Sequence, residues 1–299
     1  MKILNFGSLN VDYVYQVDHM VQAGETLSSG GMQVFLGGKG FNQSVALAKS
    51  GIEVYHAGFI GEDGRGFIQA CAEYGIHTDY IQEIPGKSGH TIIQVDRNAQ
   101  NCILLHGGSN RAITKAFVDN VLSDFEKGDY ILLQNEISEL DYIIEKAYEK
   151  EMTILLNPSP YDSYLEQCDM TKVSYFILNE IEGAQLSGVS ENDEIAEHIL
   201  KKYPKAKVVL TLGGEGSMYQ DAEQKYKQGI SKVKAVDTTA AGDTFTGYFI
   251  AGLVENMKIP DILQRCAVAA GITVSREGAS PSIPKVTEVE EKMKYDIRL

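Results

Sequence analysis

The sequence predicts an α/β fold: a doubly wound, mainly parallel sheet flanked by helices, with a small β-sheet lid. From residue 54 onward, short apolar runs alternate with helix-compatible segments, which is typical of parallel strands buried on both faces. Residues 13–35 and 89–106 interrupt this rhythm with alternating apolar and polar residues, a pattern that favours short, partly exposed antiparallel strands. With 299 residues, 43% of them hydrophobic, the chain is long enough to bury one large core.

Composition excludes some classes of partner. The formal net charge of −14 argues against a surface that binds nucleic acid or an anionic membrane. An anionic substrate stays compatible with this charge if a metal ion or backbone amides neutralise it locally. No apolar run approaches the roughly 20 residues of a membrane span, and the first residues resemble a strand rather than a signal peptide. The four cysteines form no Cys-x-x-Cys pair, so we expect a cytoplasmic protein with reduced thiols. From the charge and the apolar runs we expect neither a nucleic-acid nor a membrane partner.

Polar residues follow the predicted strands at the points where these strands end. Residues 3–6 form an apolar run, and Asn10 and Asp12 come soon after it. Four later apolar runs are also followed by polar residues, and these runs cover residues 130–133, 153–156, 175–178 and 208–210. Because the carboxyl ends of parallel strands share one edge of the sheet, this edge is the expected ligand site. For Asn10 and Asp12 taken alone, a solvated turn with Asx hydrogen bonds is the favoured interpretation.

The two interrupting segments are expected to pair into a separate small sheet. In the second segment, residues 91–96 and 102–105 flank a polar turn at residues 97–100, which is a hairpin pattern. Such a sheet could lie over the strand ends as a lid. We therefore assign the chain to an α/β nucleotide- and substrate-binding domain and a discontinuous lid, which comprise residues 1–11, 36–88 and 107–299, and residues 12–35 and 89–106, respectively.

A glycine-rich segment lies between the two lid segments. Residues 36–44 read Leu-Gly-Gly-Lys-Gly-Phe-Asn-Gln-Ser and precede a helical run that includes Val45 and ends at Gly51. The glycines allow a ligand to approach the backbone, and Lys39 and Asn42 offer donors that suit a polyol. A tight turn that opens a helix would use the same glycines. A Walker A loop is excluded, because the Gly-Lys-Ser at residues 86–88 is not preceded by the required glycine.

A second segment of small residues lies near the C-terminal third of the chain. Residues 237–245 read Asp-Thr-Thr-Ala-Ala-Gly-Asp-Thr-Phe and run into an apolar, helix-compatible stretch. The N-terminus of a helix binds anions, because its first N–H groups lack intrahelical partners and the helix dipole favours negative charge. Asp243 at this position suggests a base that accepts a proton from a hydroxyl group attacking a bound phosphate. The alternative is that Asp243 only complements the helix dipole.

Together these residues resemble the ribokinase-like (phosphofructokinase B type) carbohydrate kinases, and the ribokinase branch of that family most closely. The resemblance extends from the first predicted strand to about Pro284. Two segments carry it: residues 37–43, with glycines at 51 and 61 at the family's spacing, and residues 237–245. The resemblance implies the family's α/β fold and a lid that pairs between two subunits, so we expect a homodimer.

The resemblance also implies roles for individual residues. Asp243 corresponds to the catalytic base, and the amides of Ala240, Ala241 and Gly242 correspond to the anion hole for the transferred γ-phosphoryl group. Other positions correspond to those that hold the sugar: Asn10, Asp12, Gly38, Lys39, Asn42 and Glu136, together with Asp243 itself. Positions on the nucleotide side correspond to Asn179, Thr211, Gly213 and Gly216.

Two cation sites are implied by the same resemblance. Asn179 and Glu182 match an Asn-x-x-Glu element that organises Mg²⁺ and phosphate, largely through water. A monovalent cation, expected to be K⁺, is implied beside the anion hole by residues that match the family's cation loop: Asp237, Thr239, Thr273, Arg276, Gly278 and Ser282. One position departs from the family's pattern, because Ala267 stands where many members of the ribokinase branch carry Asn near the adenine.

The function that follows is an ATP-dependent sugar kinase that phosphorylates the primary hydroxyl group of D-ribose. Asn10, Asp12 and Asn42 favour a vicinal diol, although deoxyribose, a ketohexose derivative or a nucleoside would undergo the same chemistry. A non-catalytic sugar-binding regulator of the same fold is a second class of function, but it would have no need of Asp243. A dinucleotide-dependent oxidoreductase is disfavoured, because no Gly-x-Gly-x-x-Gly follows the first predicted strand.

Overall fold

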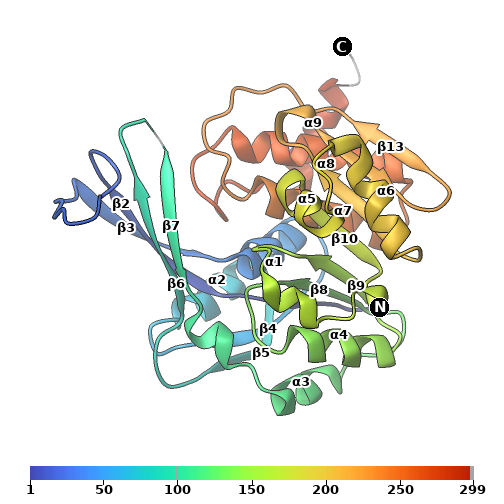
Figure 1. The fold of residues 1–299 in the computed structure, drawn as a ribbon, viewed down its shortest axis with the longest axis horizontal. Coiled ribbons are helices and arrows are strands. Elements are labelled where there is room, and N and C mark those ends of the chain that lie inside the picture. Colours follow the sequence, from blue (N-terminus) through green and yellow to red (C-terminus); the bar gives the residue numbers. More distant parts are fainter. Residues whose placement is uncertain (99, 297–299) are drawn as a thin grey trace.

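The main sheet of the protein positions the candidate site. A computed structural model describes residues 1–98 and 100–296. Within these residues, nine strands form one sheet in the order β13-β12-β11-β10-β9-β8-β1-β4-β5 (Figure 1). The strands from β11 to β5 in this order are all parallel, whereas β12 and β13 add an antiparallel edge. The bounds of the nine strands are β1 (Ile3–Phe6), β4 (Tyr55–Ile60), β5 (His77–Glu83), β8 (Tyr130–Gln134), β9 (Thr153–Asn157), β10 (Tyr175–Asn179), β11 (Lys207–Thr211), β12 (Ser217–Gln220) and β13 (Lys225–Gln228).

Helices cover both faces of this sheet and form two apolar core layers. In β8, Ile131 and Leu133 pack into one layer and Leu132 into the other, because successive side chains of a strand point to opposite faces. One layer also receives side chains from α3 (Lys115–Leu122), α4 (Leu140–Glu149), α5 (Glu180–Ser187) and α6 (Asn192–Lys202). The other receives them from α1 (Lys39–Lys49), α2 (Gly66–Tyr74), α7 (Ala241–Val254), α8 (Ile259–Val274) and α9 (Val286–Asp296).

Short 3₁₀ helices complete the connections, and their bounds are η1 (Gly108–Ala112), η2 (Ser163–Gln167), η3 (Met170–Lys172) and η4 (Gly213–Glu215). A helix that combines the length and the apolar character needed to cross a membrane does not occur in the described part of the chain. The doubly wound sheet confirms the predicted fold class, because parallel strands buried on both faces alternate with helices that pack on both sides.

A second, smaller sheet projects from the body of the molecule (Figure 1). Its strands, among the described residues, follow the order β3-β2-β6-β7 and are β2 (Asn10–Gln16), β3 (Gly31–Gly37), β6 (Gly89–Val95) and β7 (Asn101–His106). The pairs β2–β3 and β6–β7 are antiparallel, and β2 and β6 run parallel. The predicted hairpin is therefore present, although Ala99 of its predicted turn lies outside the described residues. The assignment of the two sheets to separate domains stays a prediction.

The boundaries of two elements differ from the expectation. Strand β2 begins at Asn10, so Asn10 and Asp12 belong to the small sheet and do not lie in a turn after β1. Helix α1 begins at Lys39, inside the glycine-rich segment and ahead of the predicted helical run. Gly38 is its N-cap and has a φ of 92°, a conformation that favours glycine, so the segment is at once a helix start and a surface of the site.

Helices α1 and α7 pack against each other without an intervening side chain. A Cβ atom placed on Gly247 of α7 would lie 2.4 Å from Cβ of Ala46 and 2.8 Å from the backbone nitrogen of Leu47, both in α1. Only glycine fits at this crossing point. The first turns of α1 and α7 can therefore approach each other at the carboxyl edge of the sheet.

We predict that Gly247→Ala lowers the free energy of unfolding by roughly 1–3 kcal/mol, because the added methyl group forces two packed backbones apart. The sign is informative, since alanine in a helix interior is otherwise favoured over glycine by about 1 kcal/mol. Chemical denaturation of purified protein measures the change. Gly229→Ala is the control, because no atom lies within 4 Å of its Cβ position. A Gly247→Ala protein as stable as the parent would contradict this account of the helix crossing.

Candidate active site

The predicted base lies in the first turn of α7 and is buried. Asp243 is 8% exposed. Its Oδ1 atom accepts a hydrogen bond of 2.9 Å from Nε2 of Gln43, and its Oδ2 atom accepts one of 3.2 Å from Nδ2 of Asn42. Both donors come from the first turns of α1. The two segments that the sequence singled out therefore meet at this carboxylate.

Backbone N–H groups are free beside the carboxylate. Ala240, the N-cap of α7, is left-handed with a φ of 59°. The N–H of Ala241 closes a turn on the carbonyl oxygen of Thr238 at 3.3 Å, whereas those of Gly242 and Asp243 donate to no protein group in the described part of the chain. Apart from its own neighbours in the helix, no atom of the described residues lies within 4 Å of a Cβ position on Gly242. Unpaired donors at a helix N-terminus with open space above them form an anion site.

Polar and charged side chains gather around Asp243 on one side of the α7 N-terminus, which we call the polar side of the site. Lys39 and Glu136 are two of its charged residues. Oε2 of Glu136 accepts a hydrogen bond from the hydroxyl group of Ser8 and a second, of 3.2 Å, from the backbone nitrogen of Lys39. Burial raises the pKa of Glu136, although the positive charge of Lys39 opposes this rise. Burial opposes the charge of Lys39, but the carboxylates of Asp243, Glu136 and Glu182 outweigh it and raise the pKa of Lys39. Lys39 is therefore a protonated donor among acidic groups.

Asp12 reaches the polar side of the site from the small sheet. Its Oδ1 atom accepts a hydrogen bond of 2.6 Å from the hydroxyl group of Thr91. Its Oδ2 atom lies only 2.0 Å from the Cβ position of Gly37, so a side chain at residue 37 would displace the carboxylate. Burial raises the pKa of Asp12 to about 6, against the effect of the Thr91 hydrogen bond, and the charge of Glu136 adds to the rise.

The polar side also contains the side-chain amides of Asn10 and Asn42. A hydrogen bond orients the first, and the oxygen of the second has no partner in the described part of the chain. Oδ1 of Asn10 accepts a hydrogen bond of 2.7 Å from Nδ2 of Asn110, which fixes the side chain of Asn10 with its own amide group on the other side. The backbone of Gly38 lies against this amide, because a Cβ atom there would lie 3.2 Å from Nδ2 of Asn10. Oδ1 of Asn42 is buried and has no hydrogen-bond partner in the described part of the chain. A buried acceptor without a partner suits a ligand that brings a hydroxyl donor.

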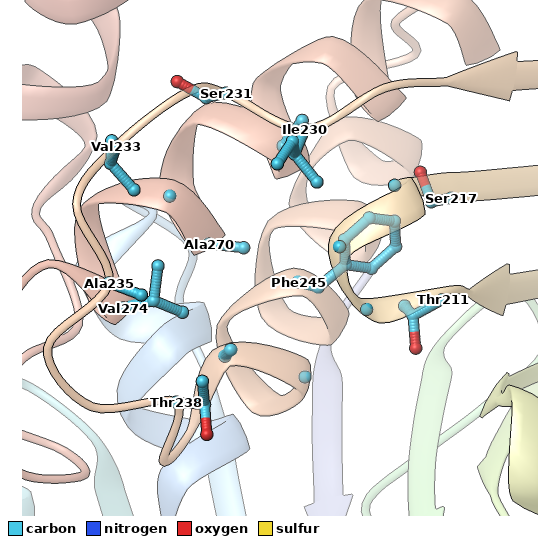
Figure 2. A pocket seen from close by; sticks show the side chains of 17 residues that line it. Thr211, Ser217, Ile230, Ser231, Val233, Ala235, Thr238, Phe245, Ala270 and Val274 are labelled. Atoms are coloured by element: carbon cyan, nitrogen blue, oxygen red, sulfur yellow. The ribbon is translucent and has the colours of Figure 1, made fainter.

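An apolar cavity opens on the other side of the α7 N-terminus. Its volume is about 330 Å³. Figure 2 shows that the segment around Ser231 and Val233 arches over one side of it, while Phe245 and Thr211 line it from other elements. Three residues predicted for the nucleotide line it, namely Thr211, Gly213 and Gly216, and so does Ala267, the position that departs from the family pattern. Because Ala241 and Gly242 also line the cavity, it is continuous with the anion site.

Asn179 and Glu182 have a structural role that the sequence analysis missed. Oδ1 of Asn179 accepts a hydrogen bond of 2.8 Å from the backbone nitrogen of Glu182, and Oε2 of Glu182 accepts one of 3.1 Å from the backbone nitrogen of Asn179. This is a capping box at the start of α5, and the Asn-x-x-Glu spacing was the signal for it. Oε1 of Glu182 accepts no hydrogen bond in the described part of the chain. The negative charge of Glu182 contributes to the raised pKa of Lys39. One carboxylate oxygen thus stays available for a hydrated cation that is also held by a ligand's phosphates.

Asp237 joins the two segments predicted to bind a monovalent cation. Its carboxylate accepts hydrogen bonds from the backbone nitrogen and hydroxyl group of Thr239 and from the backbone nitrogen of Gly278. Burial opposes ionisation of Asp237, but these hydrogen bonds lower its pKa below the ordinary value. The carboxylate thus holds residues 237–239 against residue 278, and a carboxylate is an oxygen ligand of the kind that a hard cation prefers.

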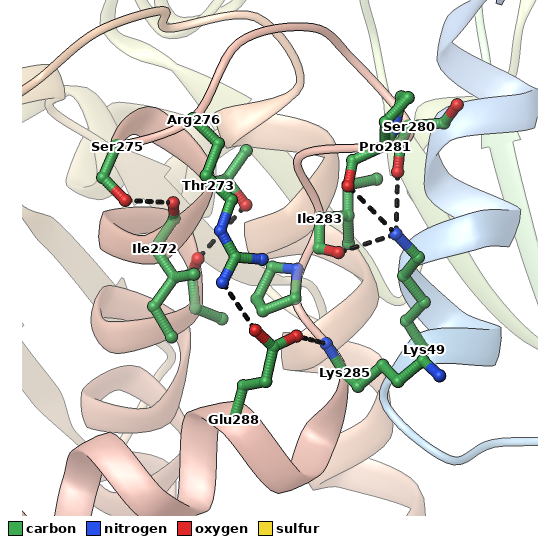
Figure 3. A network of polar contacts seen from close by, with 12 residues as sticks. Lys49, Ile272, Thr273, Ser275, Arg276, Ser280, Pro281, Ile283, Lys285 and Glu288 are labelled. Carbon is green, nitrogen blue, oxygen red and sulfur yellow. Dashed lines mark hydrogen bonds and ion pairs between the residues drawn. The ribbon is translucent and has the colours of Figure 1, made fainter.

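The rest of this loop is held by other contacts (Figure 3). The carbonyl oxygen of Thr273 accepts a hydrogen bond from the backbone nitrogen of Arg276, whose side chain pairs with Glu288. Ser282 forms a turn on the carbonyl oxygen of Ala279. The ammonium group of Lys49 in α1 donates to the carbonyl oxygens of Ser280 and Ile283 at 2.9 and 2.7 Å. The cation loop is thereby attached to the helix that begins at Lys39.

Several residues that build the site were absent from the predicted set. Ser8, Asn110 and Thr91 orient predicted residues, and Gln43 holds the carboxylate of Asp243. Gln43 belongs to the glycine-rich motif at residues 37–43, so its place beside the site could be predicted from the sequence. The partners of the others depend on pairings between distant segments, and no local pattern marks them.

Comparisons with known proteins identify the family of the chain. The model of the family described as "pfkB family carbohydrate kinase" matches residues 1–286. The Ribokinase of Lactococcus lactis is 33% identical over 299 residues, which cover 98% of this chain and 97% of that protein. The Deoxyribokinase of Salmonella typhi is 29% identical over 97% of this chain and 98% of that protein. The structure of Arabidopsis thaliana Ribokinase complexed with ribose and ATP is similar with a TM-score of 0.85 and 28% identity, covering 98% of each chain.

Proposed function

Because the chain belongs to the pfkB family of carbohydrate kinases, we propose that it transfers the γ-phosphoryl group of ATP to the primary hydroxyl group of D-ribose. One observation carries the proposal: Asp243 and the unpaired N–H groups of Gly242 and Asp243 lie between a cluster of polar side chains and an apolar cavity. The polar cluster offers groups that suit a small polyol, and the cavity suits the base of a nucleotide. The proposed reaction joins the two ligands at the helix N-terminus.

The chemistry of transfer needs few protein groups. Asp243 accepts the proton of the primary hydroxyl group as the oxygen forms its bond to the γ-phosphorus. The bond from this phosphorus to the bridging oxygen breaks, and ADP leaves with the electron pair. The N–H groups of Gly242 and Asp243 stabilise charge on the transferred group, whose transition state is loose and depends mainly on positioning and electrostatics. Single donors of this kind at oxyanion sites contribute roughly 2.7–4 kcal/mol.

Cations belong to the proposal as well. Mg²⁺ would be held by Glu182 and Asn179 largely through water and by the nucleotide phosphates, and when bound it neutralises their charge. A monovalent cation, K⁺ first, would be held by Asp237 and main-chain oxygens of the attached loop, and when bound it supports the anion site electrostatically. The free Oε1 atom of Glu182 and the carboxylate of Asp237, which links the two segments of the loop, support these assignments. The cytoplasm is the proposed location.

The choice of ribose rests on the side chains that face a sugar diol. Asn10, Asp12 and the unpaired Oδ1 atom of Asn42 offer both donors and acceptors. A sugar without a 2-hydroxyl group would leave part of this set unpaired, at a cost of about 1–3 kcal/mol for a buried polar group. The similarity to a deoxyribokinase makes 2-deoxyribose the second candidate substrate.

The test is a coupled assay of ADP formation with Mg²⁺ against pentoses, hexoses and nucleosides, each with K⁺ and with Na⁺. K⁺-stimulated turnover that favours D-ribose over 2-deoxyribose supports the proposal. Turnover on a different sugar keeps the mechanism and changes the substrate. Binding of sugar without any turnover would instead indicate a non-catalytic regulator.

Asp243→Asn tests the base directly. We predict that kcat falls by roughly 10²–10⁴-fold, the usual contribution of a positioned general base, whereas sugar still binds. Stopped-assay kinetics gives kcat, and isothermal titration calorimetry gives sugar affinity. A variant with a rate near that of the parent would overturn the assignment of Asp243.

The raised pKa of Asp12 predicts how sugar binding depends on pH. Above its pKa of about 6, Asp12 is a carboxylate that accepts hydrogen bonds from sugar hydroxyl groups through a charged oxygen, and below it one oxygen becomes a donor and the charge is lost, so these hydrogen bonds weaken. The KM for sugar is therefore expected to rise as pH falls from 7 to 5, by about tenfold per unit once the pH lies below the pKa. Asp12→Asn should have a high KM with little dependence on pH in this range. The same rise in the variant would assign the effect to another group.

The small sheet supports a proposed homodimer. Its register places Ile103, Leu105 and Phe35 on the face that carries Asp12, and all three are exposed, Ile103 to 56%. An exposed apolar sheet face beside a site suits a second copy of the same face, which would also close over the sugar.

We predict that Ile103→Glu lowers the mass in solution from that of two chains to that of one, because it introduces charge into a packed apolar face. Sedimentation velocity measures this change. Ile68→Glu, at an exposed position of α2, is the control and should leave the mass unchanged. A parent protein that sediments as a single chain would overturn the dimer.

A further inference from the structure

A continuous series of buried hydrogen bonds, called the hydrogen-bond chain below, connects the sheet to Asp243. It passes through five buried residues that the proposed mechanism does not use, in the order His56, Ser44, Asn5, Gln134 and Gln43. All five are fully buried, with an exposure of 0%. They come from β1, α1, β4 and β8, so the hydrogen-bond chain crosses from the sheet into the first turns of α1.

The direction of each bond in the hydrogen-bond chain is determined. The carbonyl oxygen of Gly7 lies 3.2 Å from Nε2 of His56 and can only accept, so Nε2 carries the proton and Nδ1 accepts from the hydroxyl group of Ser44. Burial lowers the pKa of His56 to about 4, which agrees with a neutral ring. Ser44 in turn accepts from Nδ2 of Asn5 at 2.8 Å.

The remaining amides follow from the same reasoning. Nδ2 of Asn5 also donates to the carbonyl oxygen of Gly40 at 2.7 Å, so its Oδ1 atom is the acceptor for Nε2 of Gln134 at 3.0 Å. Nε2 of Gln134 donates its second proton to Oε1 of Gln43 at 2.7 Å. With that oxygen committed, Nε2 of Gln43 is the atom that faces Asp243 and donates to Oδ1 at 2.9 Å.

We propose that Gln43, held by Gln134, is a positioning residue that fixes the Asp243 carboxylate so that Oδ2 is the atom that receives the substrate proton. The inference rests on the proposed role of Asp243 as the base. Oδ1 is engaged by Gln43 from beneath, and Oδ2 is contacted by Asn42, the residue whose own Oδ1 atom is open to a ligand. The carboxylate thus presents one oxygen to the sugar side and cannot rotate without breaking a buried hydrogen bond.

A positioning role makes a kinetic prediction that a purely structural role does not. Gln43→Met keeps the length and volume of the side chain but removes the donor to Oδ1. We expect kcat to fall by about 10–100-fold, because a misplacement of about 1 Å costs up to 10²-fold, while the KM for sugar changes less than about threefold. In the Asp243→Asn background the same substitution should not lower the residual rate further, because the group on which it acts is absent.

A second variant keeps the test independent of folding. Gln134→Met leaves the Gln43–Asp243 bond in place but frees the amide of Gln43 to rotate, so we expect a smaller fall in kcat, again with an unchanged KM. Ser50→Ala is the control, because its buried hydroxyl group lies at the opposite, C-terminal end of α1 and bonds only the carbonyl oxygen of Leu47. Circular dichroism and thermal melting show which variants are folded.

The outcomes separate this inference from the proposed function. If Asp243→Asn loses its rate while folded Gln43→Met and Gln134→Met keep the kcat of the parent, the positioning role is wrong and the base assignment stands. Equal fractional losses in the parent and Asp243→Asn backgrounds would also contradict it, since they indicate a general structural effect. If Asp243→Asn itself is fully active, the proposed function fails first.

Discussion

The contact between α1 and α7 at Gly247 is the constraint on which the rest of the site depends. Because no side chain separates the helices there, their first turns meet at the carboxyl edge of the sheet. Asn42 and Gln43 of α1 consequently reach the carboxylate of Asp243, and the unpaired N–H groups of α7 lie beside them. If α1 and α7 were farther apart, the polar side chains of α1 and the anion site of α7 would no longer meet at Asp243.

Charge is the second physical feature of this arrangement. The protein has a formal net charge of −14, and the carboxylates of Asp243, Glu136 and Glu182 act on the ammonium group of Lys39, while Asp12 lies within the field of Glu136. In the proposed function, binding of a polyphosphate here would depend on backbone N–H groups, on the α7 dipole and on cations that accompany the nucleotide. The raised pKa values of Asp12 and Glu136 have the same origin, because burial disfavours their charged forms.

The sequence was sufficient for the fold and for most of the candidate site, for reasons that particular residues make clear. Parallel strands such as β8 and β10 are apolar throughout and end in polar residues, so both the sheet and its functional edge were predictable. Asn10 and Asp12 were expected at this edge, but their strand pairs with β3 and β6, and such long-range pairing has no local signal. Helix α1 begins at Lys39, inside the glycine-rich segment, where the low helix propensity of glycine hides the start of the helix. The roles of Gln134 and Asn5 depend on which buried amides meet beneath α1, which only the packed structure determines.

The most direct test of this account is a crystal structure of the protein with D-ribose and a non-hydrolysable ATP analogue. The account predicts the primary hydroxyl oxygen within about 2.6–3.2 Å of Oδ2 of Asp243, with the terminal phosphoryl group facing the N–H of Gly242 and the adenine in the cavity beside Ala267. A sugar whose primary hydroxyl group points away from Asp243, or a nucleotide bound outside this cavity, would contradict the central claim that one buried carboxylate at the start of α7 joins the two ligands.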